Sequence, residues 1–315
     1  MYCSITSELP SAASTCPVCG HGSLSVLVIT GDLHYDLCPQ CALCTKHVRH
    51  GGAREDFATG QASYYDDVDA DPFAEPQAIM RERAARRVAV LRAYLRTGAS
   101  VLEIGPGGGQ VANWLRQQDC RYLGCEVSRS LAERLEAQGI PVVHGEFESI
   151  HLPESYDLVL SFHTIEHVPE PRAQLTKAFS VTRAGGHFII ATPNARSWEH
   201  RLLPRLSANF DAGHLHVLSP KSLRILAEEA GWRVESCMTS EYTSDWLRVV
   251  TKFLRRIKGE DEVTSAGKYS RSAASGSIAR AISIISVFTR PLRGLQARLG
   301  GGNEVVMVLR KPGVA

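Results

Sequence analysis

The chain has 315 residues, of which 44% are hydrophobic and 22% are charged. This length and composition are typical of a packed globular protein and exclude a fibrous or intrinsically disordered one. The 35 Lys and Arg residues stand against 33 Asp and Glu residues, a formal net charge of +2. A charge so close to zero disfavours a dedicated nucleic-acid binder, because such proteins need a strongly basic surface.

The sequence has no run of about 20 apolar residues, the length that crosses a bilayer as a helix. Its first ten residues contain Glu8 but neither Lys nor Arg, so they lack the basic start of a secretory signal. We therefore expect a cytoplasmic protein. In that reducing compartment we expect its cysteines to be thiols or metal ligands rather than disulfides.

Six of the nine cysteines lie within the first 44 residues. Two Cys-x-x-Cys pairs are separated by 18 residues: Cys16 with Cys19, and Cys38 with Cys41. This spacing predicts a zinc ribbon over residues 1–50, with short strands at 24–29 and 33–37 and a structural zinc ion held by four thiolates. Cys44 in place of Cys41 is the alternative fourth ligand. A redox role is disfavoured because no βαβ pattern accompanies the pairs.

Residues 51–76 are rich in Gly, Asp, Ala and Pro without a sustained period, which predicts a linker arm. Within it, Tyr64 and Tyr65 are candidates for a lid over a cofactor or for an exposed pair. From residue 77 to 95, apolar residues recur at helical spacing between arginines. We therefore expect a helix there with its arginines in solvent.

The remaining chain, residues 77–315, alternates between short apolar segments and helical patterns. Strands are expected at 101–104, 122–127, 142–144, 156–161, 187–191 and 232–236, and helices at 111–118, 130–138, 172–182 and 220–230. This alternation predicts an α/β, doubly wound, mostly parallel sheet with helices on both faces. In such sheets a ligand binds at the carboxyl ends of the strands.

Polar and glycine residues gather at the ends of four of these strands. A glycine-rich loop follows the first strand, where glycine permits close approach of the backbone to a ligand. Glu126, which ends the second strand, can accept hydrogen bonds from the hydroxyls of a ribose. Glu146 and Phe147, which follow the third strand, can bind an adenine through its amine and its ring. The candidate cofactor-binding residues are Glu103, Gly105, Gly107, Gly109, Glu126, Glu146, Phe147, Ser161 and Phe162.

The motifs in this stretch occur in a familiar order. They read Glu103-x-Gly105-x-Gly107-x-Gly109, then Ile165-Glu166-His167-Val168, then Arg183-Ala184-Gly185-Gly186. The stretch from about 101 to 234 resembles a class I S-adenosylmethionine-dependent methyltransferase. A nicotinamide enzyme is disfavoured because the loop is not GxGxxG. The resemblance implies S-adenosylmethionine as cofactor and a Rossmann-like, seven-stranded sheet whose last strand, expected at 304–310, is antiparallel.

Methyl transfer is an in-line displacement that needs alignment and, for a hydroxyl acceptor, removal of a proton. A histidine is suited to this base role near neutral pH. We expect His167 to be the base, with Glu166 orienting it, and His163 to be the second candidate. In the alternative interpretation, the Glu-His-Val segment only orders its loop by hydrogen bonds.

A zinc module joined to a methyltransferase resembles bacterial enzymes of glycan and natural-product pathways. This implies O-methylation of a small molecule or a sugar or glycan intermediate. A sugar C-methyltransferase and a ribosomal RNA base methyltransferase are the alternatives, and the near-zero net charge disfavours nucleic acid as the partner. A non-enzymatic alternative is a zinc-ribbon interaction module on a degenerate methyltransferase scaffold.

An insertion at about 241–302 precedes the last strand. From Glu241 to the C-terminus the local net charge is +7, so the preceding residues sum to −5. Residues 278–299 combine helical apolar spacing with arginines, and Pro291 is expected to break them into two segments. This segment either contacts a membrane peripherally or packs its apolar face on the domain or on a second subunit. The oligomeric state does not follow from the sequence.

Overall fold

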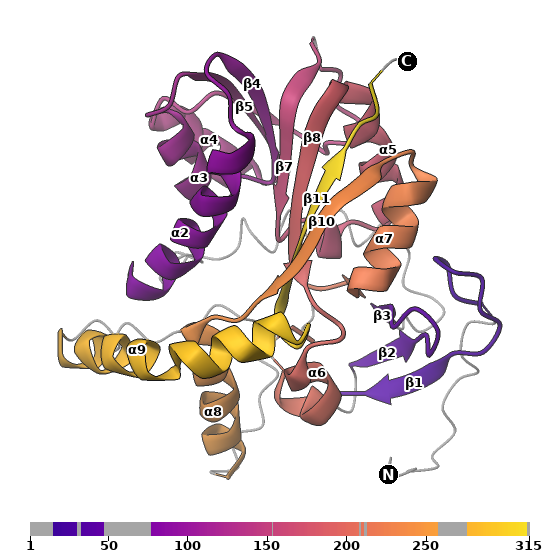
Figure 1. Ribbon diagram of the computed structural model, residues 1–315, viewed down its shortest axis with the longest axis vertical. Helices are drawn as coiled ribbons and strands as arrows, with labels where there is room; N and C mark the ends of the chain where they lie inside the picture. The colour runs from indigo at the N-terminus through magenta and orange to yellow at the C-terminus, as the bar shows by residue number, and fades with distance from the viewer. Residues whose placement is uncertain are drawn as a thin grey trace.

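The computed structural model describes residues 15–29, 33–46, 77–152, 154–207, 209–210, 213–257 and 276–313. The linker arm at 51–76, with Tyr64 and Tyr65, lies outside these residues. Figure 1 shows a large central sheet with helices on both sides and a smaller sheet beside one end of it.

The larger sheet has seven strands in the order β10-β11-β8-β7-β4-β5-β6. They are β4 (Ala99–Ile104), β5 (Cys120–Glu126), β6 (Val142–His144), β7 (Tyr156–Phe162), β8 (Thr182–Pro193), β10 (Arg233–Ser240) and β11 (Glu304–Arg310). β11 is antiparallel to both of its neighbours, and the other pairs are parallel. The predicted fold class is confirmed, including the antiparallel last strand.

The strands alternate their apolar side chains between two core clusters, as the two-residue period of a strand requires. On one face, Val101, Leu158 and Ile189 pack in the same cluster. On the other face, Leu102, Val159 and Phe188 form part of the main cluster. Both faces are buried, which is why these strands read as continuous apolar runs in the sequence.

Helices cover the two faces of the sheet. α2 (Gln77–Tyr94), α3 (Gln110–Leu115) and α4 (Arg129–Ala137) lie on one side, and α5 (Pro171–Val181) and α7 (Pro220–Glu229) on the other (Figure 1). The N-terminus of α7 is fixed by a capping box, in which the Ser219 side chain accepts from the Ser222 backbone and the Ser222 hydroxyl accepts from the Ser219 backbone.

The cysteine-bearing segment is joined to the main domain. Its strands β1 (Ser25–Val28), β2 (His34–Leu37) and β3 (Cys44–Lys46) form an antiparallel sheet that β9 (His216–Val217) extends. Several of its buried residues share the main core cluster with Leu218 and Leu223. The sequence predicted two strands here but not β3 or the strand that the main domain contributes.

The insertion before β11 forms α8 (Thr243–Ile257) and α9 (Gly276–Arg298). The short η1 (Ile165–His167) follows β7, and α6 (Trp198–Leu202) and η2 (Pro204–Leu206) follow β8. The expected break at Pro291 is wrong, because α9 continues through it. Pro291 is exposed, and so is Val287, whose carbonyl loses its hydrogen bond. Water can satisfy that carbonyl, so the helix tolerates the proline. Among the described residues, no helix is long and apolar enough to cross a membrane.

Ion pairs attach the insertion to α2. Arg83 lies 3.1 Å from Asp245 of α8, and Arg293 of α9 lies 2.6 Å from Glu82. Arg293 is only 1% exposed. The expectation that the α2 arginines face solvent is therefore wrong for Arg83, because the insertion covers this side of the helix.

Candidate active site

The glycine-rich loop between β4 and α3 adopts a backbone that favours glycine. Gly105, Gly107 and Gly109 have φ values of 68°, 53° and 72°. A Cβ at Gly105 would lie 2.6 Å from Thr164 Oγ1, and one at Gly109 would lie 2.7 Å from Leu135 Cδ2. Larger residues at these two positions would therefore be strained and would clash with neighbouring side chains of the protein, which explains why glycine occurs there.

Glu126 connects the end of β5 to this loop. Its Oε2 accepts a hydrogen bond from Gly107 N at 3.0 Å, and its Oε1 accepts one from Ser128 N at 3.0 Å. Burial raises the pKa of Glu126, and the backbone donors oppose that shift. The carboxylate is therefore fixed beside the glycine loop, in the position from which we expected it to bind the ribose hydroxyls of the cofactor.

The other expected cofactor residues occupy different environments. Glu103 is buried and accepts from Tyr122 Oη at 2.7 Å, and burial raises its pKa to about 7. The Ser161 hydroxyl is buried with no hydrogen-bond partner among the described residues, so a donor or acceptor of a cofactor would suit it. Glu146 is exposed, whereas Phe147 is 4% exposed and packs in the core, so its stacking role stays a prediction.

His163 lies between two buried carboxylates. Its Nδ1 is 3.1 Å from Glu166 Oε1, and its Nε2 is 2.8 Å from Glu304 Oε1. Burial alone would lower the pKa of His163, but the hydrogen bonds and charges of Glu166 and Glu304 outweigh it and raise the pKa. Carboxylate oxygens beside both ring nitrogens therefore favour the protonated ring, in which both nitrogens donate.

The network extends beyond these three residues. Thr192 Oγ1 donates to Glu166 at 2.9 Å, and Tyr242 Oη donates to Glu304 at 2.5 Å. His163 has a φ of 55°, a value that few non-glycine residues adopt. Sequence reasoning missed Glu304 and Tyr242. The one available signal was a carboxylate at the start of an otherwise apolar strand.

His167 lies on η1 at the same edge of the sheet. Its Nδ1 is 2.8 Å from the carbonyl oxygen of Gly213, and its ring meets that of His214 edge-on, with centroids 4.8 Å apart. Because a carbonyl only accepts, Nδ1 is the donor, and Nε2 is the acceptor in the neutral ring. The structure thus places Glu166 against His163, and His167 is oriented by the Gly213 carbonyl, contrary to the expected pairing.

Glu166, His167 and His214 also place one potential ligand atom each within 4.8 Å of the others. His214 Nδ1 is 2.7 Å from the carbonyl oxygen of Asn209, an arrangement similar to that of His167. The three residues come from the segment after β7 and from the loop before α7. These two segments therefore meet in one polar cluster.

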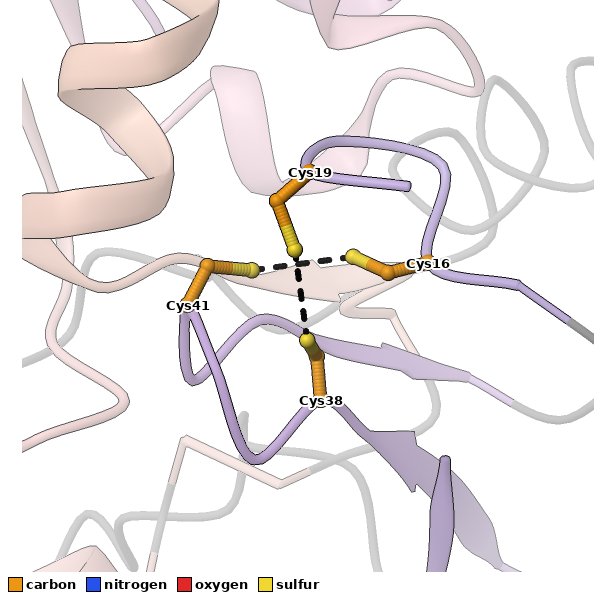
Figure 2. Close-up of side chains that lie close together, drawn as sticks. All are labelled: Cys16, Cys19, Cys38 and Cys41. Carbon is orange, nitrogen blue, oxygen red and sulfur yellow. Dashed lines mark hydrogen bonds between the residues drawn. The ribbon is translucent and has the colours of Figure 1, made fainter. Parts of the chain in front are cut away.

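The four expected cysteines converge. Cys16 and Cys41 sulfurs are 3.6 Å apart, Cys19 and Cys38 sulfurs are 3.5 Å apart, and Figure 2 shows all four directed at one point. Tetrahedral bonds of about 2.3 Å to zinc would place sulfurs roughly 3.8 Å apart. Cys44 packs in a different cluster, with Tyr35 and Val217. The sulfur cluster therefore contains Cys41 and not Cys44.

This segment is attached to the loop that carries His214. Tyr35 Oη donates to the His214 carbonyl at 2.8 Å, and Lys46 N donates to the Leu215 carbonyl at 2.7 Å. The Ser219 hydroxyl donates to the Cys41 carbonyl. The N-terminal segment that carries the cysteines thus contacts the loop before α7 through three hydrogen bonds.

A family described as methyltransferase domain matches residues 77–237, about half of the chain. The chain belongs to the methyltransferase domain family. Its fold and the order of its motifs are those of class I S-adenosylmethionine-dependent methyltransferases.

Three curated relatives are similar to this methyltransferase domain. A "Probable S-adenosylmethionine-dependent methyltransferase" of Mycolicibacterium smegmatis is 28% identical over 46% of this chain and 56% of its own length. A ubiquinone biosynthesis O-methyltransferase of Photorhabdus laumondii is 28% identical over 32% of this chain and 46% of its length. The tRNA 5-carboxymethoxyuridine methyltransferase of Escherichia coli is 30% identical over 47% and 65%. The chain thus spans about half to two-thirds of these relatives.

Among solved structures, the cyclase SpnF has a TM-score of 0.50 and 13% identity, covering 82% of this chain and 94% of SpnF. At that identity the likeness shows the fold alone.

Proposed function

We propose that this methyltransferase transfers a methyl group from S-adenosylmethionine to an oxygen of a small molecule or of a sugar or glycan intermediate. The observation that carries the proposal is the position of Glu126, which is fixed by Gly107 N and Ser128 N beside the glycine loop. Glu103 and Ser161 would complete the cofactor site from neighbouring strands. The family match and the O-methyltransferase relative support the same reaction class.

The cofactor would supply an electrophilic methyl group. The chain then has to align the acceptor oxygen and remove its proton. We assign the base to His167, because its Nδ1 donates to the Gly213 carbonyl and its Nε2 is therefore the basic nitrogen of the neutral ring. His163 is a positioning residue, since a ring that donates to both Glu166 and Glu304 has no lone pair for the acceptor's proton.

We propose that the cysteine cluster holds one structural zinc ion. Four thiolates would complete a tetrahedron and leave no position for a reacting water. The proposal is supported by the convergence and burial of the sulfurs and by their separations of 3.5 and 3.6 Å. The ion would fix the Cys38–Cys41 turn, on which Ser219 and the loop before α7 depend.

The tRNA-modifying relative supports nucleic acid as a second acceptor class. The net charge of +2 argues against it, because contacts with phosphates require many basic residues on one surface.

Calorimetric titration with S-adenosylmethionine tests the cofactor site. We expect one site per chain and at least a tenfold weaker affinity in Glu126→Ala, while Glu133→Ala on the exposed side of α4 leaves the affinity unchanged. Assays of methyl transfer to nucleotide sugars, phenols and transfer RNA would then distinguish the acceptor classes. If the wild-type protein did not bind the cofactor, the enzymatic proposal would fail and the scaffold alternative would stand.

A further inference from the structure

A cavity of about 250 Å³ lies between α2, α9 and the ends of β7, β10 and β11. It is lined by Arg86, Arg87, Ala89, Val90, Phe162, Met238, Ser240, Tyr242, Arg290, Glu304 and Val306. Phe162, Tyr242 and Glu304 place it next to the His163 network, at the carboxyl edge of the sheet. The glycine-rich loop does not contribute to it.

The charges around this cavity are unbalanced. Three arginines line it, against one carboxylate, Glu304, whose oxygens already accept from His163 and Tyr242. Arg87 lies over the Phe162 ring at 5.0 Å, and Arg86 lies over the Tyr242 ring at 5.4 Å.

Within the part of the chain that the structure describes, neither Arg86 nor Arg87 forms an ion pair, and nor does Arg290, although Arg83 on the same helix pairs with Asp245. Arg87 Nε is buried without a hydrogen-bond partner. The charge of Arg87 lowers the pKa of Glu304, so this single carboxylate faces His163 and three arginines, and the cavity keeps an excess of positive charge and an unused donor.

From this arrangement we propose that the cavity binds an oxyanion, a phosphate or carboxylate, on the methyl acceptor. Guanidinium groups match the geometry of both anions, and the stacked arginines are held in place by the aromatic rings. Val90, Met238 and Val306 supply an apolar wall for the ring or chain that carries the anion. The proposal rests on the proposed function, because it assigns the position of the methyl acceptor, next to the His163 network.

Binding of phenyl phosphate, benzoate and the neutral benzyl alcohol to the full chain tests this assignment. We expect both anions to bind at least tenfold more tightly than the alcohol, and Arg86→Gln and Arg290→Gln each to weaken the anions about tenfold. Arg224→Gln, on the exposed face of α7, is the control, and thermal melts establish that the variants are folded.

Equal affinity for the anions and the alcohol, no anion binding, or no effect of either arginine would overturn it. A titration with S-adenosylmethionine on the same samples separates this result from the proposed function: loss of cofactor binding would refute the enzyme, and loss of anion binding alone would refute only the acceptor class.

The outer faces of α8 and α9 carry a second feature, a set of exposed apolar side chains here called the α8–α9 face. On α8, Val250, Phe253, Leu254 and Ile257 are 53%, 51%, 52% and 68% exposed. On α9, the exposed residues are Ile284, Ile285, Val287, Phe288, Leu292 and Leu295, and the exposed Leu299 directly follows the helix. Their spacing places them along a stripe of each helix, and apolar side chains that gather on exposed helix faces mark an interaction site.

The position and charge of the α8–α9 face indicate its partner. Figure 1 shows both helices at the end of the molecule toward which β8 points, the edge that carries the candidate active site. Their sequences contain eight Lys and Arg residues, of which Arg293 is buried and pairs with Glu82, and one acidic residue, Asp245, which pairs with Arg83. A second copy of the chain would bring two positive surfaces together, whereas an anionic bilayer complements both the charge and the apolar stripes.

We infer that the α8–α9 face docks on an anionic lipid bilayer, with the acceptor cavity facing the membrane. Sedimentation with vesicles of phosphatidylcholine, with and without phosphatidylglycerol, tests this. We expect at least tenfold more binding to the anionic vesicles, weakening with added salt, and loss of binding in Phe253→Ser with Phe288→Ser. Val143→Ser, an exposed apolar residue on β6, is the matched control.

Absence of preference for anionic vesicles would overturn this inference, as would binding that survives the double substitution. Sedimentation equilibrium showing a dimer that Phe253→Ser with Phe288→Ser dissociates would assign the face to a second copy instead.

Discussion

Tyr35, in the sheet that carries the cysteine cluster, donates its hydroxyl to the main-chain carbonyl of His214 at 2.8 Å. Tyr35 is fully buried, and 179 residues separate the two partners in sequence. The His214 ring in turn packs against His167. The N-terminal segment thus contacts the loop that carries one histidine of the pair at the candidate active site.

Replacing Tyr35 with phenylalanine should show this connection. Loss of one buried hydrogen bond should lower the free energy of unfolding by about 1 kcal/mol. Because the lost partner is the His214 backbone, we also expect kcat for methyl transfer to fall while the affinity for S-adenosylmethionine stays unchanged. Tyr156→Phe, another buried tyrosine at the opposite end of the sheet, is the control. Equal effects of both substitutions on kcat would contradict the proposed connection.

The zinc proposal predicts a difference between two buried cysteines. Cys16→Ser removes one of the four converging sulfurs, whereas Cys44→Ser alters a thiol that packs with Tyr35 and Val217. We expect wild type and Cys44→Ser to carry one zinc per chain by native mass spectrometry and Cys16→Ser to carry less. Cys16→Ser should also melt at a lower temperature, since metal binding contributes to folding. A metal-free wild-type protein would refute the zinc site.

The sequence predicted those parts of the molecule that local pattern determines. The alternation of apolar segments indicated six strands of the large sheet, the family resemblance supplied the last one, and the cysteine spacing indicated the four sulfurs that converge. The continuous α9 was missed because a proline inside a helix leaves a carbonyl without its hydrogen bond. At the exposed Pro291, water can satisfy that carbonyl, and the helix continues. β9 was missed because two residues, His216 and Val217, become a strand only through their pairing with β3.

The glycine loop provides a test that separates backbone strain from steric clash. Gly105 and Gly98 both have positive φ, at 68° and 73°. A Cβ at Gly105 would lie 2.6 Å from Thr164 Oγ1, whereas one at Gly98 would have no heavy atom within 4 Å. We expect Gly98→Ala to cost about 1 kcal/mol. Gly105→Ala should cost more and should also abolish measurable binding of S-adenosylmethionine. Similar losses in both would show that the loop needs only its backbone angles.

The His163 network could not be predicted, because it joins residues that are 141 positions apart in the sequence. Glu304 is both the first residue of β11 and the partner of His163, and the antiparallel register of β11 with β8 brings it to this edge. The motif identified Glu166 and His167 as neighbours in the chain. It did not reveal that the Glu166 carboxylate turns toward His163.

The same network predicts a defined dependence of stability on pH. His163 has its pKa raised above 6.5 by Glu166 and Glu304, so its contribution is complete below pH 6.5 and is lost as the pH rises through the raised value. Glu166 and Glu304 have pKa values lowered from 4.5 to about 2 by the His163 contacts, so their contribution is complete above pH 4.5 and is lost toward pH 2.

We therefore expect the difference in the free energy of unfolding between wild type and His163→Gln to be largest between pH 4.5 and 6.5. It should be on the order of 3 kcal/mol there, because the substitution leaves two buried carboxylates without their cation. The difference should shrink on both sides of this window. Urea unfolding across pH measures it, with the exposed His151→Gln as control. A difference that does not change with pH would show that the His163 ring is neutral, and His163 would then return as a candidate base.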